Sequence, residues 1–248
     1  MCARFPAAMA AAAVMLSWAS LAAGLAPPTR RAVLGLVGLA AVPQAGTADA
    51  STARAQLLDA IARGADVEAA IEALIPFDPS AGRGARSTAL DGRWRLIWSQ
   101  KAEAFSPLLG LPVPLRPQSY QLVGAVAAPV VGADRVAQLL EFPGGISLIL
   151  SSGVAPAASQ PRVLDIFPPF RFELALGGGG GRWTAVEAGS DAEFRAQNGR
   201  DRAAQAAQPN EYEQRYLETS GLAGDLRVST IVAGDPVIVG AVFVHVRE

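Results

Sequence analysis

The residue types most often used for nucleophilic or metal chemistry are scarce in this sequence. His245 is the only histidine and Cys2 the only cysteine among 248 residues. A Ser-His-Asp or Cys-His arrangement would have to use His245. Cys2 lies in a segment that we expect to be removed. The one remaining histidine cannot form a zinc site by itself. His245 lies near the end of a predicted strand, so we expect a structural edge-strand histidine, with no metal site.

Acidic and glycine-rich segments add no catalytic signature. The carboxylates Glu141, Asp165, Glu173 and Glu187 are scattered, and no spacing singles out an acid/base pair. The Gly177–Gly181 run lacks the G-K-[ST] ending of a phosphate-binding loop and lies between two strand patterns, as a hairpin connection would. We therefore predict no catalytic residue, no cofactor and no enzymatic activity.

Composition predicts a folded chain with a sizeable core. The sequence is 51% hydrophobic and 17% charged, so global disorder is not expected. The formal net charge of −1 argues against broad electrostatic binding of nucleic acid. We expect one domain with extensions and no nucleic acid partner.

Residues 1–50 are predicted to be two targeting signals in series. Arg4 precedes an apolar run, Ala7–Ala23, and the Arg30-Arg31 pair precedes a second run that ends at Ala48-Asp49-Ala50, an A-x-A cleavage pattern. The alternative is one or two retained membrane anchors, although both runs are short for a bilayer-spanning helix. Tandem signals of this kind resemble those of algal plastid proteins. We therefore expect the thylakoid lumen, with stroma or plastoglobule as alternatives.

Residues 51–89 are predicted to form a helical lead-in and a linker. Ser51 or Thr52 can cap a first helix that Gly64 ends, and Asp66 can cap a second that Pro76 stops. We expect the apolar stripe of these helices to pack on the domain that follows or to plug one of its ends. A membrane-lying or partner-binding helix is the alternative, but the polar face lacks the cationic residues typical of such helices.

Residues 90–248 are predicted to be an antiparallel β-domain. In Leu90–Gln100, Trp94, Leu96 and Trp98 alternate with Arg93, Arg95 and Ile97, which is the period of two of a half-buried strand. Short strands separated by turn residues favour a barrel or sandwich over a parallel α/β fold. The further strand candidates are Ser119–Ala127, Arg135–Phe142, Ile146–Ser151, Arg162–Phe167, Phe170–Leu176, Arg182–Glu187, Glu211–Glu218, Asp225–Ile231 and Pro236–Arg247.

Two connections differ from ordinary solvated turns. The proline-rich stretch Lys101–Pro117 carries apolar residues, among them Leu109 and Val113, which we expect to pack against the domain or to touch a membrane. The polar stretch Ser190–Pro209 is predicted to be an inserted, solvated loop.

Motifs at both ends of the domain resemble the plastid lipid-associated protein (fibrillin) family. Gly92-Arg93-Trp94 fits the G-x-W that opens the first strand of lipocalins. The segments Tyr216-Leu217-Glu218 and Asp225–Ser229, followed by Gly240 and Phe243-Val244, are similar to the closing motif of that family. The helix at Gln56–Ile61 and the stretch Leu90–Leu96 stand in the matching order, with residues 220–224 as an insertion.

The resemblance implies a lipocalin-like barrel that binds or organises a quinone, a carotenoid or a lipid, with peripheral association at thylakoids or plastoglobules. We expect Trp94 to close the barrel floor and Arg227 to stack on it, a structural pair that belongs to the motif with Gly92, Tyr216 and Asp225. Trp98, Tyr120 and Phe142 are the predicted ligand contacts. A non-catalytic scaffold for thylakoid complexes is the alternative function, and an isoprenoid-modifying enzyme a third.

Overall fold

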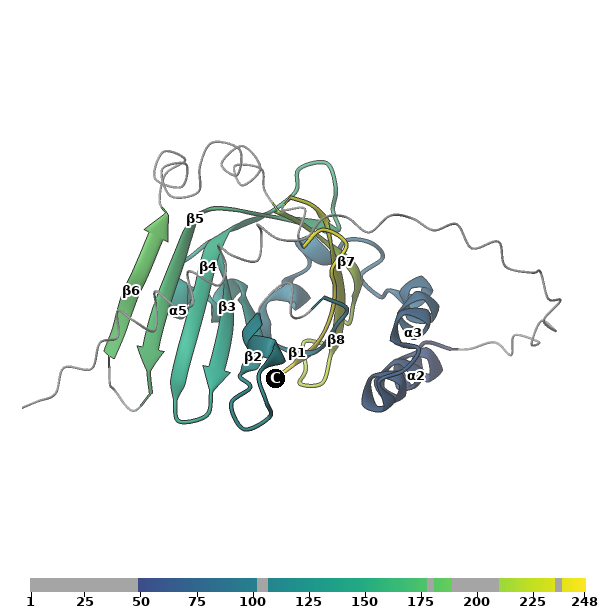
Figure 1. The fold of residues 1–248 in the computed structure, drawn as a ribbon. Helices are drawn as coiled ribbons and strands as arrows, with labels where there is room; N and C mark the ends of the chain where they lie inside the picture. Colours follow the sequence, from purple (N-terminus) through teal and green to yellow (C-terminus); the bar gives the residue numbers. More distant parts are fainter. Residues whose placement is uncertain (1–48, 102–106, 178–180, 189–209, 235–237) are drawn as a thin grey trace, which may run out of the picture. The chain divides into compact units, whose positions relative to one another are not determined.

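The protein is mainly β in the computed structural model, which describes residues 49–101, 107–177, 181–188, 210–234 and 238–248 (Figure 1). The expected targeting signals up to residue 48 and the Ser190–Pro209 insertion lie outside these residues. The strands are β1 (Gly92–Ser99), β2 (Gln118–Val123), β3 (Arg135–Phe142), β4 (Ile146–Pro156), β5 (Val163–Leu176), β6 (Gly181–Ala188), β7 (Asn210–Leu217), β8 (Leu226–Ala233) and β9 (Val242–Arg247).

Eight of the described strands close into an antiparallel barrel. The sheet runs in the order β4-β3-β2-β1-β9-β8-β7-β5-β6, and an additional β4–β5 pairing joins its two sides. β6 pairs with the second half of β5 only and therefore lies outside the ring. The expected antiparallel barrel with a helical lead-in is confirmed.

The proline pair Pro168-Pro169, which separates the predicted strands Arg162–Phe167 and Phe170–Leu176, lies inside one long strand. β5 pairs with β7 over Val163–Ile166 and with β6 from Phe170 onward, so Pro168 and Pro169 fall between its two partners. On the β4 side, the register shifts between Ser151 and Gly153 at the same level. Proline has no N–H to donate, and it is tolerated where the ladder is interrupted. Two predicted strands are therefore one.

Two other strand predictions were too long. β2 ends at Val123, where Gly124, with φ 66°, begins the short helix η6 (Gly124–Val126). β9 begins only at Val242, because residues 238–240 form a turn in which the amide of Gly240 donates to the carbonyl of Ile231.

The helical lead-in packs on the outer face of the barrel (Figure 1). Helix α2 (Ala50–Arg63) is capped by the carboxylate of Asp49, rather than by Ser51 or Thr52 as predicted, and it ends at Gly64 with φ 66°. Helix α3 (Val67–Leu74) follows. One apolar cluster unites Leu57, Ile71 and Leu74 with outward-facing residues of β7, β8 and β9. The lead-in is therefore a second layer and not a plug.

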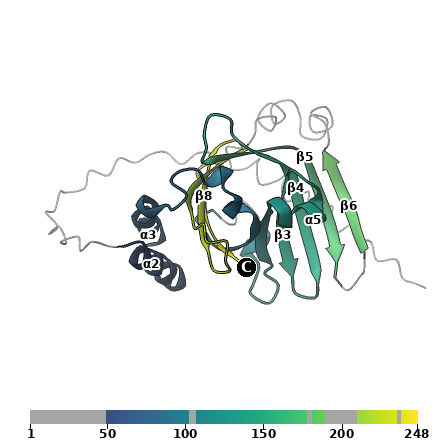
Figure 2. The ribbon, with the colours of Figure 1, turned by 180° about the vertical axis from the view of Figure 1, so that it is seen from behind.

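Shorter helical turns cover other parts of the barrel. The linker contains η2 (Ile75–Phe77), η3 (Gly84–Arg86) and η4 (Thr88–Leu90), and η5 (Pro107–Gly110) lies between β1 and β2. Together with η6, the helical turn α5 (Ala128–Val131) covers the outer face of β2, β3 and β4 (Figure 2). In the ranges that the structure describes, no helix combines the length and the apolar character needed to cross a membrane.

A bulge in β1 changes which tryptophans face the barrel interior. The pairing of β1 with β9 shifts register between Leu96 and Trp98. Trp94 and Leu96 belong to the interior cluster, whereas Trp98 packs in the outer cluster against the helices. An extra residue in one strand moves the following side chain to the other face. The prediction that all three share one face was therefore wrong for Trp98.

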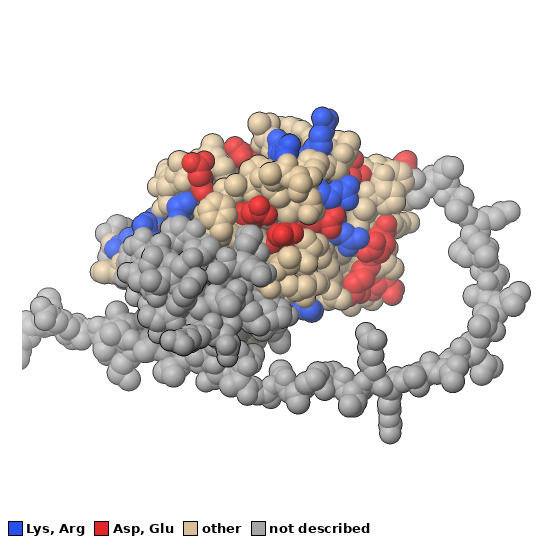
Figure 3. Space-filling view, turned by 90° about the horizontal axis from the view of Figure 1, so that it is seen from above, with Lys and Arg blue, Asp and Glu red and all other residues tan. Residues whose placement is uncertain are grey.

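The strand ends define two ends of the barrel. The Trp94 end holds Gly92, Val123 and Arg247, which pairing places together. The rim end holds Gln118, the β3–β4 turn after Phe142, and Leu176 of β5. On the face seen in Figure 3, acidic and basic side chains are interspersed.

Candidate functional site

The interior of the Trp94 end is filled by an indole between two guanidinium groups. Trp94 is fully buried, and its Nε1–H donates to the carbonyl of Leu90 at 2.8 Å. The guanidinium carbon of Arg227 lies 5.0 Å from the ring centroid, and that of Arg247 lies 4.4 Å from it. Both distances are within cation–π range. The predicted stacking of Arg227 on Trp94 is confirmed, and Arg247 is a second cation that we did not predict.

Arg247 explains why a glycine opens the first strand. Its guanidinium donates to the carbonyl oxygens of Ala89 and Asp91. A Cβ atom at position 92 would lie 2.3 Å from Arg247 Nη1. Gly92 therefore leaves the room that lets this buried arginine reach the backbone before β1.

The other two motif residues fasten loops and the helical layer to the barrel. Asp225 accepts hydrogen bonds from the Ser220 hydroxyl and from the amide of Gly221, which fixes the inserted loop, and it lies 3.6 Å from Arg247 Nε. Tyr216 donates to Glu218 at 3.0 Å, and Glu218 pairs with Arg54 of α2 at 2.9 Å. In this structure, both motif residues therefore hold neighbouring segments of the domain together.

Arg227 is almost completely buried, at 1% exposure. Its Nη2 donates to Gln121 Oε1 and to His245 Nδ1, the latter at 3.3 Å. Its Nε and Nη1 atoms have no hydrogen-bond partner among the described residues. Burial, followed by the positive charge of Arg247, lowers the pKa of Arg227 to about 9, so this side chain is charged at neutral pH.

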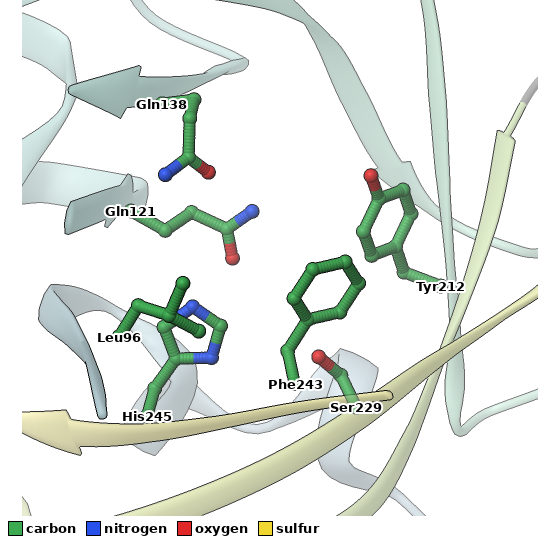
Figure 4. A pocket seen from close by; sticks show the side chains of 7 residues that line it. All are labelled: Leu96, Gln121, Gln138, Tyr212, Ser229, Phe243 and His245. Carbon is green, nitrogen blue, oxygen red and sulfur yellow. The ribbon is translucent and has the colours of Figure 1, made fainter. Parts of the chain in front are cut away.

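A small cavity of mixed polarity lies in the middle of the barrel, and two of its lining residues, Gln121 and His245, accept hydrogen bonds from Arg227 (Figure 4). Its volume of ≈ 10 Å³ is about the room that one water molecule needs. Leu96 and Phe243 form its apolar walls. Its polar lining consists of Gln121, Gln138, Tyr212, Ser229 and His245. In Figure 4, the side chains of Gln121 and Tyr212 point toward one another across it.

The inner wall between this cavity and the rim end is apolar and incompletely covered. Strand pairing places Leu150 beside Gln138, and Leu148 and Leu174 one step nearer the rim. These leucines are half-buried, although they face the barrel interior. At the rim, Ile146 is 41% exposed, and Trp183, which pairs with Leu174 from the edge strand β6, is 50% exposed.

The structure does not bring the three predicted ligand contacts together. Trp98 lies under the helical layer. Tyr120 belongs to the outer cluster beneath α5, and the guanidinium carbon of Arg93 lies 3.8 Å from its ring centroid. Of the three, only Phe142 faces the barrel interior, on the same face of β3 as Gln138. It is half-buried near the rim.

His245 is central and not at an edge, because β9 lies between β1 and β8. Arg227 can only donate, so Nδ1 of His245 accepts and the imidazole is neutral, with its proton on Nε2. Burial, with the charge of Arg227 as second cause, holds the pKa of His245 well below its usual value. Within the described ranges, no group of three His, Cys, Asp or Glu side chains could hold a metal.

Several site residues escaped the sequence analysis. Gln121, Gln138 and Ser229 lie on predicted strands. Alternation along β8 from Arg227 would have placed Ser229 inside, whereas Gln121 and Gln138 face inward because pairing aligns Gln121 with Trp94 and Gln138 with Gln121. Arg247 shares a face with Phe243 and His245 by the same period of two. A polar residue on the inner face of a barrel strand was the available signal.

Fold and site together define a closed antiparallel barrel that is polar and filled at one end and apolar and open at the other. This architecture is compatible with the binding of small apolar molecules. No protein-family profile, no curated protein and no solved structure matches the chain.

Proposed function

We propose that this protein is a lipocalin-like carrier of the plastid lipid-associated (fibrillin) type, which binds or organises a quinone, carotenoid or lipid at the thylakoid. The apolar inner wall toward the rim carries the proposal. Leu148, Leu174 and Trp183 leave apolar surface accessible inside and at the mouth of a closed barrel. Covering one such side chain fully is worth about 1.5–3 kcal/mol, so a ligand along this wall would gain affinity.

The family assignment rests on the geometry of the motifs as well as on their order. Trp94 and Arg227 stack as we expected for two residues of the motifs, and Gly92 lies against Trp94 and Arg247 in the same buried unit. The plastid location, with the lumen favoured over stroma and plastoglobule, rests on the sequence of residues 1–50.

The site supports binding rather than catalysis. The chain has a single histidine, and its Nδ1 is occupied by Arg227 deep in the barrel. A general base has to present a free lone pair to its substrate.

The test is mass spectrometry of apolar molecules extracted from the full-length protein after purification from plastid membranes. We expect one class of quinone, carotenoid or lipid at near-equal stoichiometry. Leu174→Glu puts a charge on the inner wall and should abolish this retention. Val126→Glu, on an exposed valine of η6 at the Trp94 end, is the matched control and should retain the ligand. Retention by both variants, or an empty wild-type barrel, would contradict the proposal.

A scaffold role is the second candidate, because large apolar side chains gather at the rim. Val113 is 79% exposed and Leu115 is 60% exposed in the β1–β2 connection, so the packing against the barrel that we expected for Val113 is not seen. Exposed apolar groups of this kind mark contact surfaces. A stable protein partner, recovered together with an empty barrel, would favour the scaffold over the carrier.

A further inference from the structure

The inner wall changes from polar to apolar between the cavity and the rim, and strand pairing divides it into rows of neighbouring residues. One row across the wall contains Gln121 and Gln138, followed by Leu150 and Phe172. The next row toward the rim contains Leu140, Leu148 and Leu174. The last row contains Phe142, Ile146 and Leu176. A molecule that lies along this wall would meet polar groups at one end only.

The polar end carries excess positive charge. Arg227 and Arg247 both lie inside, and Asp225 is the carboxylate beside them, 3.6 Å from Arg247. In the described part of the chain, Arg227 forms no ion pair, and two of its nitrogen atoms have no acceptor. A buried charge without a counter-ion is costly, and stacking on Trp94 offsets only part of that cost. This end of the barrel therefore favours an anion.

The cavity is lined by Gln121 and His245, the two acceptors of Arg227, and its lining offers several donors. Gln121 uses its carbonyl oxygen for Arg227, which leaves its amide NH₂ to donate. His245 accepts at Nδ1 and therefore carries its proton on Nε2. The Ser229 hydroxyl, also in the lining, can donate as well. Gln138 donates its NH₂ to Ser119 at 2.7 Å, so its oxygen is an acceptor, and the Tyr212 hydroxyl can donate or accept.

The size of the cavity restricts which group can enter. At ≈ 10 Å³, it admits about one oxygen-sized atom and no ring. A head group with a single projecting, negatively charged oxygen fits the volume, the donors and the charge. A quinone ring or the end ring of a carotenoid would have to stay nearer the rim.

We propose that the barrel binds a carboxylate carried on a single apolar chain, with a carboxylate oxygen in the cavity beside Arg227 and the chain along β4 and β5 to the rim. This inference rests on the proposed carrier function and specifies its ligand as a long-chain carboxylic acid. The donors of Gln121, Ser229 and His245 orient the head, and Arg227 supplies the charge through Gln121 and His245.

The test compares palmitate with methyl palmitate and hexadecanol, which have the same chain length but no anionic head. Equilibrium binding of each radiolabelled molecule is measured at pH 7.5 on the full-length, delipidated protein, below the micellar range. We expect palmitate to bind at least 10-fold more tightly than the other two. Equal affinities would overturn the carboxylate assignment and leave the carrier function intact, whereas failure of all three to bind would count against both.

Variants locate the head group. Arg227→Gln should abolish the preference for palmitate while methyl palmitate binds as before. Ser229→Val fills the cavity without touching Arg227, and it should abolish the preference even where Arg227→Gln fails to fold, as judged by circular dichroism. Arg93→Gln, which removes a cation from the outer face, is the matched control and should keep the 10-fold preference. A preference that survives Ser229→Val would place the head elsewhere and contradict the proposal.

Discussion

At the Trp94 end of the barrel, an indole and two guanidinium groups fill the interior, whereas at the rim end the inner wall is apolar and half-buried. Polar groups are expensive to bury, and apolar groups are expensive to leave exposed. The buried arginines at the Trp94 end and the exposed apolar side chains at the rim end therefore both lower the stability of the fold. The difference indicates that the Trp94 end fixes the geometry of the barrel, while the rim end leaves accessible the apolar surface on which the proposed ligand would bind.

The largest effect that this comparison predicts is the loss of Trp94. Trp94→Ala removes the ring on which both arginines stack, and leaves a cavity in the filled end. We expect the free energy of unfolding to fall by about 3–5 kcal/mol, measured by urea denaturation. A loss below about 1 kcal/mol would mean that the Trp94 end is not the structural end.

The second prediction concerns the charge balance of the same end. Asp225→Asn keeps the shape of the side chain but removes the negative charge beside Arg247. Two buried guanidinium groups would then repel each other without a nearby carboxylate, and we expect a loss of about 3 kcal/mol in urea denaturation. Glu141→Gln, on the outer face and paired with Arg93, is the control and should cost less than about 1 kcal/mol.

The third prediction is a pH dependence of stability below neutrality. The pKa of buried His245 lies well below 6.5, so between the two values the unfolded chain binds a proton that the folded chain does not. Stability should therefore fall as the pH falls below about 6.5, with a slope of up to about 1.4 kcal/mol per pH unit. Urea denaturation at pH 5.5, 6.5 and 7.5 measures it.

His245→Gln is the control for this pH dependence, because the chain has no other histidine. The glutamine oxygen can still accept from Arg227, and the variant should lose the slope between pH 6.5 and 5.5. An unchanged slope would assign the pH dependence to other groups.

The smallest effect on stability is expected at the rim. Trp183 is 50% exposed, so Trp183→Ala should change the free energy of unfolding by less than about 0.5 kcal/mol. The same substitution should weaken the binding of apolar ligands several-fold, as measured by equilibrium binding. The pair Trp94→Ala and Trp183→Ala therefore separates the two ends, and a Trp183→Ala protein with full affinity would refute the division.

The sequence was sufficient for the features that depend on periodicity and on local motifs. Alternation around Trp94 predicted an inward-facing strand, and the closing motif predicted the stacking of Arg227 on it. Short strands with turn residues between them predicted an antiparallel barrel or sandwich, and the resemblance of the motifs to lipocalin-like proteins favoured the barrel.

What the sequence did not predict depends on pairing between distant strands. The bulge that turns Trp98 outward is a register shift against β9, and the prolines of β5 are tolerated because that strand changes partner between β7 and β6. The cavity, likewise, forms from six strands whose side chains meet only in the closed barrel. No local pattern encodes these relations.

The pairing of β1 with β9 also sets the order in which this protein can fold. The hydrogen bond from Arg247 to the carbonyl of Asp91 joins residues 156 positions apart. Closing so long a loop early is entropically unfavourable, and such topologies fold slowly. During synthesis, β1 and the helical lead-in leave the ribosome long before β9 is made. Until then, Trp94 cannot contact Arg227 or Arg247. The barrel can therefore close only after β9 has emerged, and until then the chain exposes an apolar strand that favours engagement by chaperones.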